Sequence, residues 1–241
     1  MLCNYSGGGW MKRCNRFLKS LLFTLVFVPV CLYAVCFAYG DRAGESDRVF
    51  SDSPYKDVKR VALTFDDGPN ASTTPRLLDG LRERGVKATF FVIGKSADNN
   101  RDIIKKMYED GHLIGNHTNT HCNLAVMSCT EAQNEISLAN SVIKDITGLD
   151  TDYIRPPFGE CGKQLDSELN MFKVMWDIDP RDWSVMNAKS VVNYVVNHVD
   201  DGDIILLHDI FDTSVDSALE IIDILKAQGY EFVTVDEIFF P

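Results

Sequence analysis

Two adjacent carboxylates and a pair of histidines are the residues of this chain whose types and spacing could do chemistry. Asp66 and Asp67 stand in TFDDGP, where Gly-Pro turns the chain sharply after an apolar run. His117 and His121 stand four residues apart in HTNTH, a spacing that can point both imidazoles to one side. Two imidazole nitrogens and one carboxylate can hold a divalent metal ion and leave positions open for water. One aspartate would then bind the ion, and the other would stay free as a base.

Further ionisable residues follow other apolar runs of the chain. Arg155 ends YIR, Asp179 ends VMWDID, and His208 and Asp209 end IILLHD. In α/β folds the ligand site lies at the carboxyl ends of the strands, so we expect these side chains to meet there. The HxxxH spacing alone is weak evidence for a metal, and an Asp-Asp pair is often only a turn or cap. Their combination at the strand ends of one sheet favours a metal site.

Strand-like and helix-like segments alternate about seven times from residue 58 onward. We expect strands at 60–65, 88–94, 113–117, 172–179, 203–209 and 231–235, and helices at 74–85, 101–111, 130–148, 190–199 and 217–229. Gly85 is expected to end the first helix, and Thr130 with Gln133 to form a capping box at the start of the third. The alternation predicts a parallel sheet with helices outside, and both an open doubly wound sheet and a closed barrel fit.

The N-terminal part differs in composition from the rest. Residues 1–20 carry basic residues, 21–39 form an uncharged run long enough to span a bilayer, and 40–57 read as a polar linker before a domain at 58–241. The basic flank predicts that the N-terminus stays cytoplasmic. Whether the run is an uncleaved signal anchor or a cleaved signal peptide stays open, but both export the domain. We therefore expect a membrane-attached domain facing outside, or a secreted one.

Charge and cysteine content exclude some classes of protein. The formal net charge of −11 is unlike the basic footprint that nucleic acid requires, so no nucleic-acid partner is expected. Three of the seven cysteines, Cys122, Cys129 and Cys161, lie in the expected exported part. An odd number allows at most one disulfide among them, with Cys122–Cys129 as a candidate pair.

Five motifs carry a resemblance to a known family. TFDDGP, HTNTH, RPPFG, DPRDW and LLH occur in this order, and together they resemble the polysaccharide deacetylases with a NodB-type homology domain, carbohydrate esterase family 4. The resemblance covers roughly residues 58–240. It implies an α/β fold, a distorted (β/α) barrel of about seven parallel strands, and metal-dependent removal of N-acetyl groups from sugar polymers.

The resemblance also implies a role for each motif residue. Asp66 would be the general base, and Asp67, His117 and His121 would hold one divalent ion, zinc by ligand type, with cobalt or nickel as alternatives. Arg155 would position the base, Asp179 would orient His208, and His208 would be the general acid. The backbone amide of Phe158, where the family often has tyrosine, would help stabilise the oxyanion. The residues expected to line the substrate site are Pro157, Phe158, Trp183 and Leu206.

The expected substrate is an N-acetylated polysaccharide, foremost peptidoglycan attacked at N-acetylglucosamine. Chitin oligomers, N-acetylmuramic acid, exopolysaccharide and acetylated xylan remain open, and an esterase would use the same machinery. Two other classes of protein compete with this interpretation: a catalytically silent wall-binding protein on the same fold, and an iron oxygenase with two histidines and one carboxylate. We expect a monomer attached to the membrane by its N-terminal helix.

Overall fold

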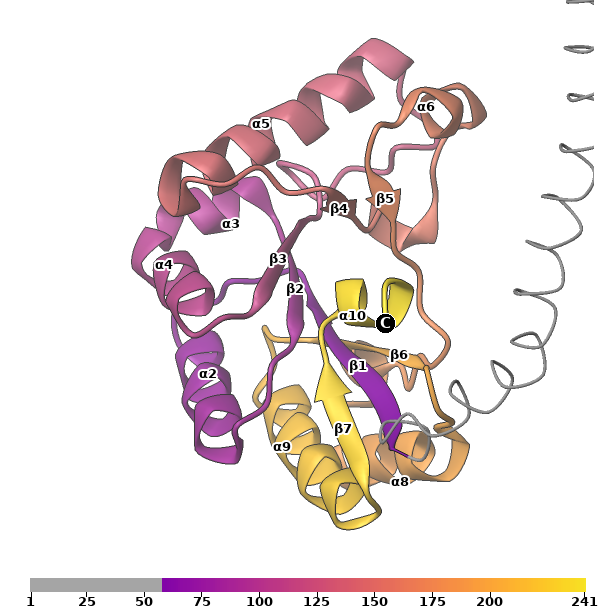
Figure 1. The fold of residues 1–241 in the computed structure, drawn as a ribbon. Helices are drawn as coiled ribbons and strands as arrows, with labels where there is room; N and C mark the ends of the chain where they lie inside the picture. Colours follow the sequence, from indigo (N-terminus) through magenta and orange to yellow (C-terminus); the bar gives the residue numbers. More distant parts are fainter. Residues whose placement is uncertain (1–57) are drawn as a thin grey trace, which may run out of the picture. The chain divides into compact units, whose positions relative to one another are not determined.

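A curved sheet of seven parallel strands is the centre of residues 58–241, the part of the chain that this computed structural model describes (Figure 1). The strands are β1 Lys59–Asp66, β2 Thr89–Val92, β3 Leu113–Asn116, β4 Tyr153–Ile154, β5 Phe172–Lys173, β6 Ile204–His208 and β7 Tyr230–Val233. Their order is β5-β4-β3-β2-β1-β6, and β7 pairs with the first half of β1. The expected α/β fold with a distorted, barrel-like parallel sheet is confirmed.

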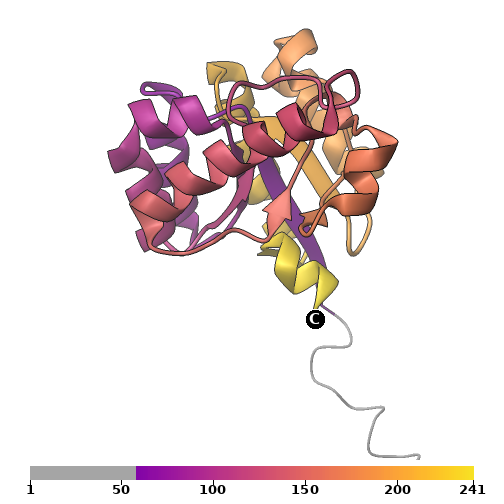
Figure 2. The same cartoon turned by 90° about the horizontal axis from the view of Figure 1, so that it is seen from above.

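Most of the helices lie around the outside of the strands in both views of the molecule (Figures 1 and 2). They are α2 Thr73–Arg84, α3 Gly94–Asn99, α4 Arg101–Glu109, α5 Cys129–Thr147, α6 Lys163–Glu168, α7 Asp182–Val185, α8 Ala188–His198, α9 Asp212–Ala227 and α10 Val235–Phe239. The main core packs between these helices and the sheet. A smaller cluster fills the concave side, where Val235 of α10 packs with Ala62, Phe91 and Ile204.

The expected strand at 172–179 is interrupted. Only Phe172 and Lys173 pair with β4, and Ile178 then makes a single bridge to Ile205 of β6. The carbonyl oxygens of Val174 and Met175 accept hydrogen bonds from the side chain of Arg155, so they are not free for a regular ladder. This segment therefore reaches from one edge of the sheet to the other and closes the barrel incompletely.

Two helix boundaries test the expected cap residues. Gly85 ends α2 with a φ of 63°, a conformation that suits glycine, as expected. The start of α5 differs from the prediction, because Ser128 and Glu131 form the capping box in place of Thr130 and Gln133. The Ser128 side chain accepts from the Glu131 N–H, and the Glu131 carboxylate accepts from the Ser128 N–H.

The expectations for 1–20, 21–39 and 40–57 concern residues outside the described part of the chain. Between residues 58 and 241, no helix combines the length and the apolar character needed to cross a bilayer. Cys122, Cys129 and Cys161 are free thiols, so the candidate Cys122–Cys129 disulfide is not formed in this structure.

A buried histidine directly before β3 makes the stability of the fold depend on pH. His112 is 5% exposed, and its Nδ1 accepts a hydrogen bond from the Ala88 N–H. Its Nε2 is buried without a partner among the described residues. Burial, together with the charge of Lys87, outweighs the effect of Asp110 and lowers the pKa of His112 from 6.5 to about 4. The folded state therefore keeps this ring neutral.

We predict that replacing His112 with Asn weakens the loss of stability in acid. Between pH 6.5 and 4 the unfolded wild-type chain binds a proton at His112 that the folded chain does not. The free energy of unfolding should therefore decrease as the pH is lowered from 6.5 to 4, and this group should account for up to about 3 kcal/mol of the decrease. Asn keeps an acceptor for the Ala88 N–H but cannot titrate. Urea unfolding at several pH values measures the slope, and His198→Asn, at an exposed position, is the control. Equal slopes in wild type and His112→Asn would contradict the assignment.

Candidate metal centre and active site

The functional residues named by the motifs meet at the carboxyl end of the sheet. Asp66 ends β1, His117 follows β3, Arg155 follows β4, and His208 ends β6, so parallel strands bring these four residues to one end. They surround a pocket of about 470 Å³. Its lining residues are Asp66, Asp67, His117, His121, Pro156, Phe158, Trp176, Asp179, Trp183, Leu206, His208 and Phe211.

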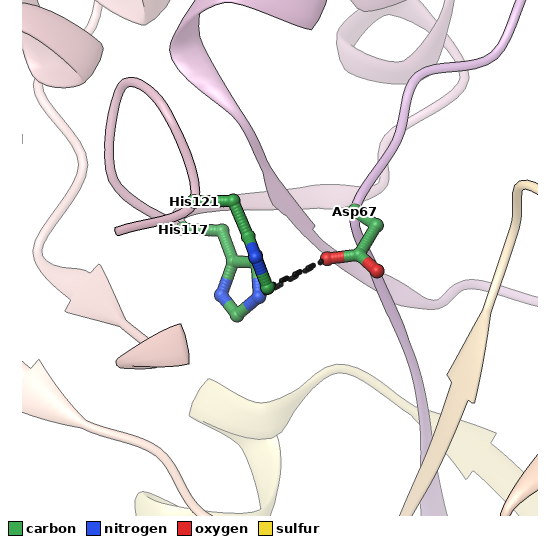
Figure 3. A group of neighbouring side chains, drawn as sticks. All are labelled: Asp67, His117 and His121. Carbon is green, nitrogen blue, oxygen red and sulfur yellow. Dashed lines mark ion pairs between the residues drawn. The ribbon is translucent and has the colours of Figure 1, made fainter. Parts of the chain in front are cut away.

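Asp67 and two histidines form the group that could hold a metal ion (Figure 3). The Oδ1 atom of Asp67 lies 3.4 Å from Nε2 of His117 and 3.2 Å from Nε2 of His121. All three side chains reach toward one point from the end of β1 and from the loop after β3. The structure thus brings together the three residues that the sequence assigned to the metal.

Hydrogen bonding around His117 indicates that its Nε2 atom carries a lone pair and not a proton. Its Nδ1 lies 2.7 Å from the carbonyl oxygen of Arg155, which can only accept, so Nδ1 carries the proton. In this tautomer the Nε2 lone pair points at Asp67. Oδ1 of Asp67 is buried and has no hydrogen-bond partner among the described residues. Electron pairs that face one another in this way fit a bound cation.

The pKa shifts also favour the protonation states that a metal requires. Burial lowers the pKa of His121 despite the nearby charge of Asp67, so this ring is neutral at neutral pH. Burial alone would raise the pKa of Asp67, but its interactions with the ring of His117, and then with His208 and His121, lower it overall. Neutral imidazoles and an ionised carboxylate are the metal-binding forms of these groups.

Backbone strain concentrates at the same place. Asp67, Thr118, His121 and Phe158 are non-glycine residues with φ values of 76°, 62°, 57° and 60°. Such conformations cost on the order of 1–3 kcal/mol each and persist where the surroundings enforce them. Oδ1 of the buried Asn116 accepts the Thr118 N–H at 2.7 Å and so fixes the turn between the two histidines. The surrounding structure holds these unfavourable backbone conformations, which orient the side chains of the site.

Asp66 has a different partner from Asp67. Its Oδ1 accepts a hydrogen bond from Nη1 of Arg155 at 2.8 Å, and its Oδ2 lies 3.8 Å from Nε2 of His117. Arg155 has no exposed surface and lies 4.3 Å above the ring of Phe91. Its other hydrogen bonds go to Thr64 Oγ1, Val174 O and Met175 O. Arg155 therefore holds Asp66 as expected, and compensates its charge without a metal.

The residue that orients His208 is Asp182, and the assignment of this role to Asp179 was wrong. Oδ1 of Asp182 lies 2.8 Å from Nδ1 of His208, and its Oδ2 accepts the His208 N–H at 2.9 Å. Asp182 is 1% exposed and is the first residue of α7. Asp179 instead accepts the N–H of Arg181, whose φ of 54° turns the chain so that Asp182 faces β6. Both aspartates belong to DPRDW, and the local motif alone did not separate them.

The ion pair with Asp182 makes His208 a strong candidate for a proton donor. Burial would lower the pKa of His208, but the hydrogen bond and charge of Asp182 outweigh it, helped by the charges of Asp66 and Asp67. Together they raise the pKa to about 9. The ring is therefore protonated at neutral pH, and its Nε2 is free to donate toward the pocket.

The expected lining residues are mostly in place. Phe158 and Trp183 are 64% and 53% exposed at the pocket mouth, and Leu206 lies in its wall. Pro157 is the exception, because it is buried in the short turn Pro157–Gly159 and Pro156 lines the pocket instead. The Phe158 N–H makes no hydrogen bond among the described residues, so it is available to a ligand. Trp176 also lines the pocket.

Asp209 packs against the turn that follows Asp67. Its carboxylate is 1% exposed and accepts the Thr74 hydroxyl at 2.5 Å, while its carbonyl accepts the Thr73 hydroxyl at 2.6 Å. A Cβ on Gly68 would lie 2.2 Å from this carboxylate, so only glycine fits directly after Asp67. The close contact fixes the turn that presents Asp67 to the histidines.

Comparison with known proteins identifies the family. The family model described as polysaccharide deacetylase matches residues 54–174. The peptidoglycan-N-acetylglucosamine deacetylase PgdA of Listeria monocytogenes is 42% identical over 184 residues, which cover 76% of this chain and 40% of PgdA. The chain thus spans less than half the length of that curated relative.

Solved structures agree with this match. The peptidoglycan deacetylase PdaC from Bacillus subtilis superposes with a TM-score of 0.74 at 40% identity, covering 76% of this chain and 91% of that one. A family 4 acetyl xylan esterase from Clostridium thermocellum, in complex with a cobalt ion, gives a TM-score of 0.72 at 39% identity, covering 75% and 90%. The motifs, the barrel and these matches together show that the chain belongs to the polysaccharide deacetylase family, carbohydrate esterase family 4.

Proposed function

We propose that this domain is a metal-dependent hydrolase that removes N-acetyl groups from polysaccharide, with N-acetylglucosamine of peptidoglycan as its substrate. The observation that carries the proposal is the buried Oδ1 of Asp67, which faces two imidazole nitrogens and has no hydrogen-bond partner between residues 58 and 241. It lies beside Asp66, whose charge Arg155 already compensates. PgdA and PdaC, whose names state peptidoglycan deacetylation, support the choice of substrate.

Asp67, His117 and His121 would hold one divalent ion. A bound ion of this kind polarises an acyl oxygen and acidifies water. Two imidazoles and a carboxylate suit zinc, with cobalt and nickel as alternatives. The cobalt ion in the related acetyl xylan esterase supports a divalent transition metal.

Asp66 is the proposed general base. Its Oδ1 is fixed by Arg155, and its Oδ2 is the oxygen nearer to His117 and lies beside the pocket. A water between this oxygen and the substrate carbonyl would lose its proton to Asp66 as it attacks the acyl carbon. Arg155 keeps the carboxylate in place until the proton arrives, because the charge-assisted hydrogen bond fixes Oδ1.

His208 and Phe158 act on the other atoms of the amide. The departing nitrogen is a poor leaving group unless it is protonated, and His208, held by Asp182, supplies that proton. The Phe158 N–H can donate to the acyl oxygen as negative charge develops on it. Asp66, Arg155, Asp182 and His208 are all in place, which argues against a catalytically silent wall-binding protein.

A second candidate is an esterase that removes O-acetyl groups from xylan. The structural match to an acetyl xylan esterase favours it, and the same base, acid and metal ligands would serve an ester. Acetylated xylan therefore belongs in any substrate panel beside peptidoglycan and chitin oligomers.

We propose that the domain works outside the cell, either held at the membrane by residues 21–39 or secreted after their removal. The uncharged run and the basic residues before it support export, and peptidoglycan would be met there. A monomer suffices for this function, because the proposed catalytic groups all come from one chain.

We predict that a chelator abolishes acetate release from peptidoglycan and that zinc or cobalt restores it. His121→Ala should weaken binding of the metal by more than the ~10–100-fold that is typical of outer ligand partners. His198→Ala, at an exposed histidine that is not among the candidate metal ligands, should bind the metal with wild-type affinity. Acetate release by enzymatic assay and metal content by mass spectrometry give the two measurements. Full activity in a sample that contains no metal would refute the proposal.

We predict that Asp66→Asn separates metal binding from turnover. Asn has nearly the same shape and can still accept from Arg155, but it cannot take up a proton. Turnover should fall by about 10²–10⁴-fold, the usual contribution of a general base, while the affinity for zinc changes little. Calorimetric titration with zinc and acetate release test both halves. An Asp66→Asn protein with wild-type turnover would rule out this base.

We predict that Asp182→Asn moves the alkaline limb of the pH–rate profile to lower pH. His208 must be protonated to donate, and its pKa of about 9 keeps activity up to that region, or somewhat below it once a cation offsets Asp67. Loss of the Asp182 charge should lower this pKa by about 1–3 units, so activity should fall at lower pH. Asp179→Asn should leave the limb in place. If Asp179→Asn moves the limb and Asp182→Asn does not, Asp182 is not the residue that orients His208.

A further inference from the structure

A second concavity lies beside the active pocket and shares a wall with it. It encloses about 460 Å³, and its lining residues are Trp176, Asp177, Asp179, Pro180, Arg181, Val185 and Tyr194. Trp176 and Asp179 also line the active pocket. We infer that this concavity is a binding subsite for a neighbouring sugar of the glycan chain, an inference that rests on the function proposed above.

Tyr194 supplies an aromatic surface for such a sugar. It lies on α8, it is 45% exposed, and its ring stacks on His198 with centroids 4.5 Å apart and planes 27° apart. His198 is itself held, because its Nδ1 lies 2.7 Å from the carbonyl oxygen of Tyr194. One face of the ring is thus braced and the other is available. An exposed, braced aromatic ring offers a large contact area and loses little conformational entropy on binding.

The polar side chains of the concavity have unused hydrogen-bonding capacity. Oδ2 of Asp177 accepts the Ile204 N–H at 2.9 Å, and Oδ1 of Asp179 accepts the Arg181 N–H at 2.8 Å. The second oxygen of each carboxylate makes no hydrogen bond among the described residues. The same holds for the guanidinium of Arg181, whereas the other six arginines between residues 58 and 241 all bond through their side chains.

Aromatic rings together with fixed carboxylates and a guanidinium match the chemistry of a sugar, which has apolar C–H faces and hydroxyls that donate and accept. The volume lies within the range of about 300–1,000 Å³ that is usual for small-molecule sites. A chain whose acetylated unit occupies the active pocket would therefore place a neighbouring unit against Tyr194. The subsite would make the enzyme favour oligomers and polymers over single sugars.

The test compares wild type, Tyr194→Ala, Tyr194→Phe and Tyr108→Ala on N-acetylglucosamine oligomers of increasing length. Tyr108 is a partly exposed tyrosine on α4 and serves as the control. The factor by which Tyr194→Ala lowers kcat/KM should grow with chain length and reach on the order of tenfold for the longest oligomers. Tyr194→Phe, which keeps the ring, should restore most of the loss, and Tyr108→Ala should match wild type. Thermal unfolding shows whether each variant is folded.

Two results would overturn the subsite: the same loss at every chain length, or no loss at any. A wild-type protein that releases acetate from none of the oligomers, from peptidoglycan or from acetylated xylan would instead count against the proposed function. In that case, calorimetry with the N-acetylglucosamine pentamer, which compares its affinity for the wild type and for Tyr194→Ala, still tests whether the subsite binds a sugar. Equal affinities would reject it, and a weaker Tyr194→Ala would support it.

Discussion

Charge compensation at the end of β1 is the constraint on which the site depends. Asp66 and Asp67 are adjacent, and two carboxylates this close repel one another unless each has a partner. Asp66 has one in the buried guanidinium of Arg155. Asp67 is faced by the two imidazoles, and His117 is held in the tautomer that points a lone pair at it. A cation at that point would complete the arrangement and would leave Asp66 free for the proposed proton transfer.

The shape of the barrel allows Arg155 to reach Asp66 and compensate its charge. Arg155 reaches across its concave side and ties Asp66 to the carbonyl groups of Val174 and Met175, so it links β1 to the segment that approaches β6. Removing one partner of such a buried pair typically costs about 3–5 kcal/mol, because the other charge is left uncompensated. Asp209 fixes the turn after Asp67 in a comparable way. Stability and catalysis therefore depend on some of the same side chains.

Much of this could be predicted from sequence, where local patterns carried the information. The alternation of apolar runs and the position of ionisable residues at their ends located the site, and HTNTH together with the Asp pair indicated the candidate metal ligands that the structure brings together. The roles of Asp179 and Asp182 were not separable locally, because the turn at Arg181 that decides between them depends on packing against β6. The break in the expected 172–179 strand likewise follows from hydrogen bonds to an arginine distant in sequence.

X-ray absorption spectroscopy on the zinc-loaded protein, with Asp66→Asn and Asp67→Asn beside the wild type, would show which side chains bind the ion. We expect two imidazole nitrogens at about 2.0–2.1 Å from the zinc and a carboxylate oxygen at about 2.0–2.2 Å from it. This first shell should be unchanged in Asp66→Asn and altered in Asp67→Asn. A shell that loses its carboxylate when Asp66 is replaced, or that contains fewer than two imidazoles in the wild type, would contradict the account.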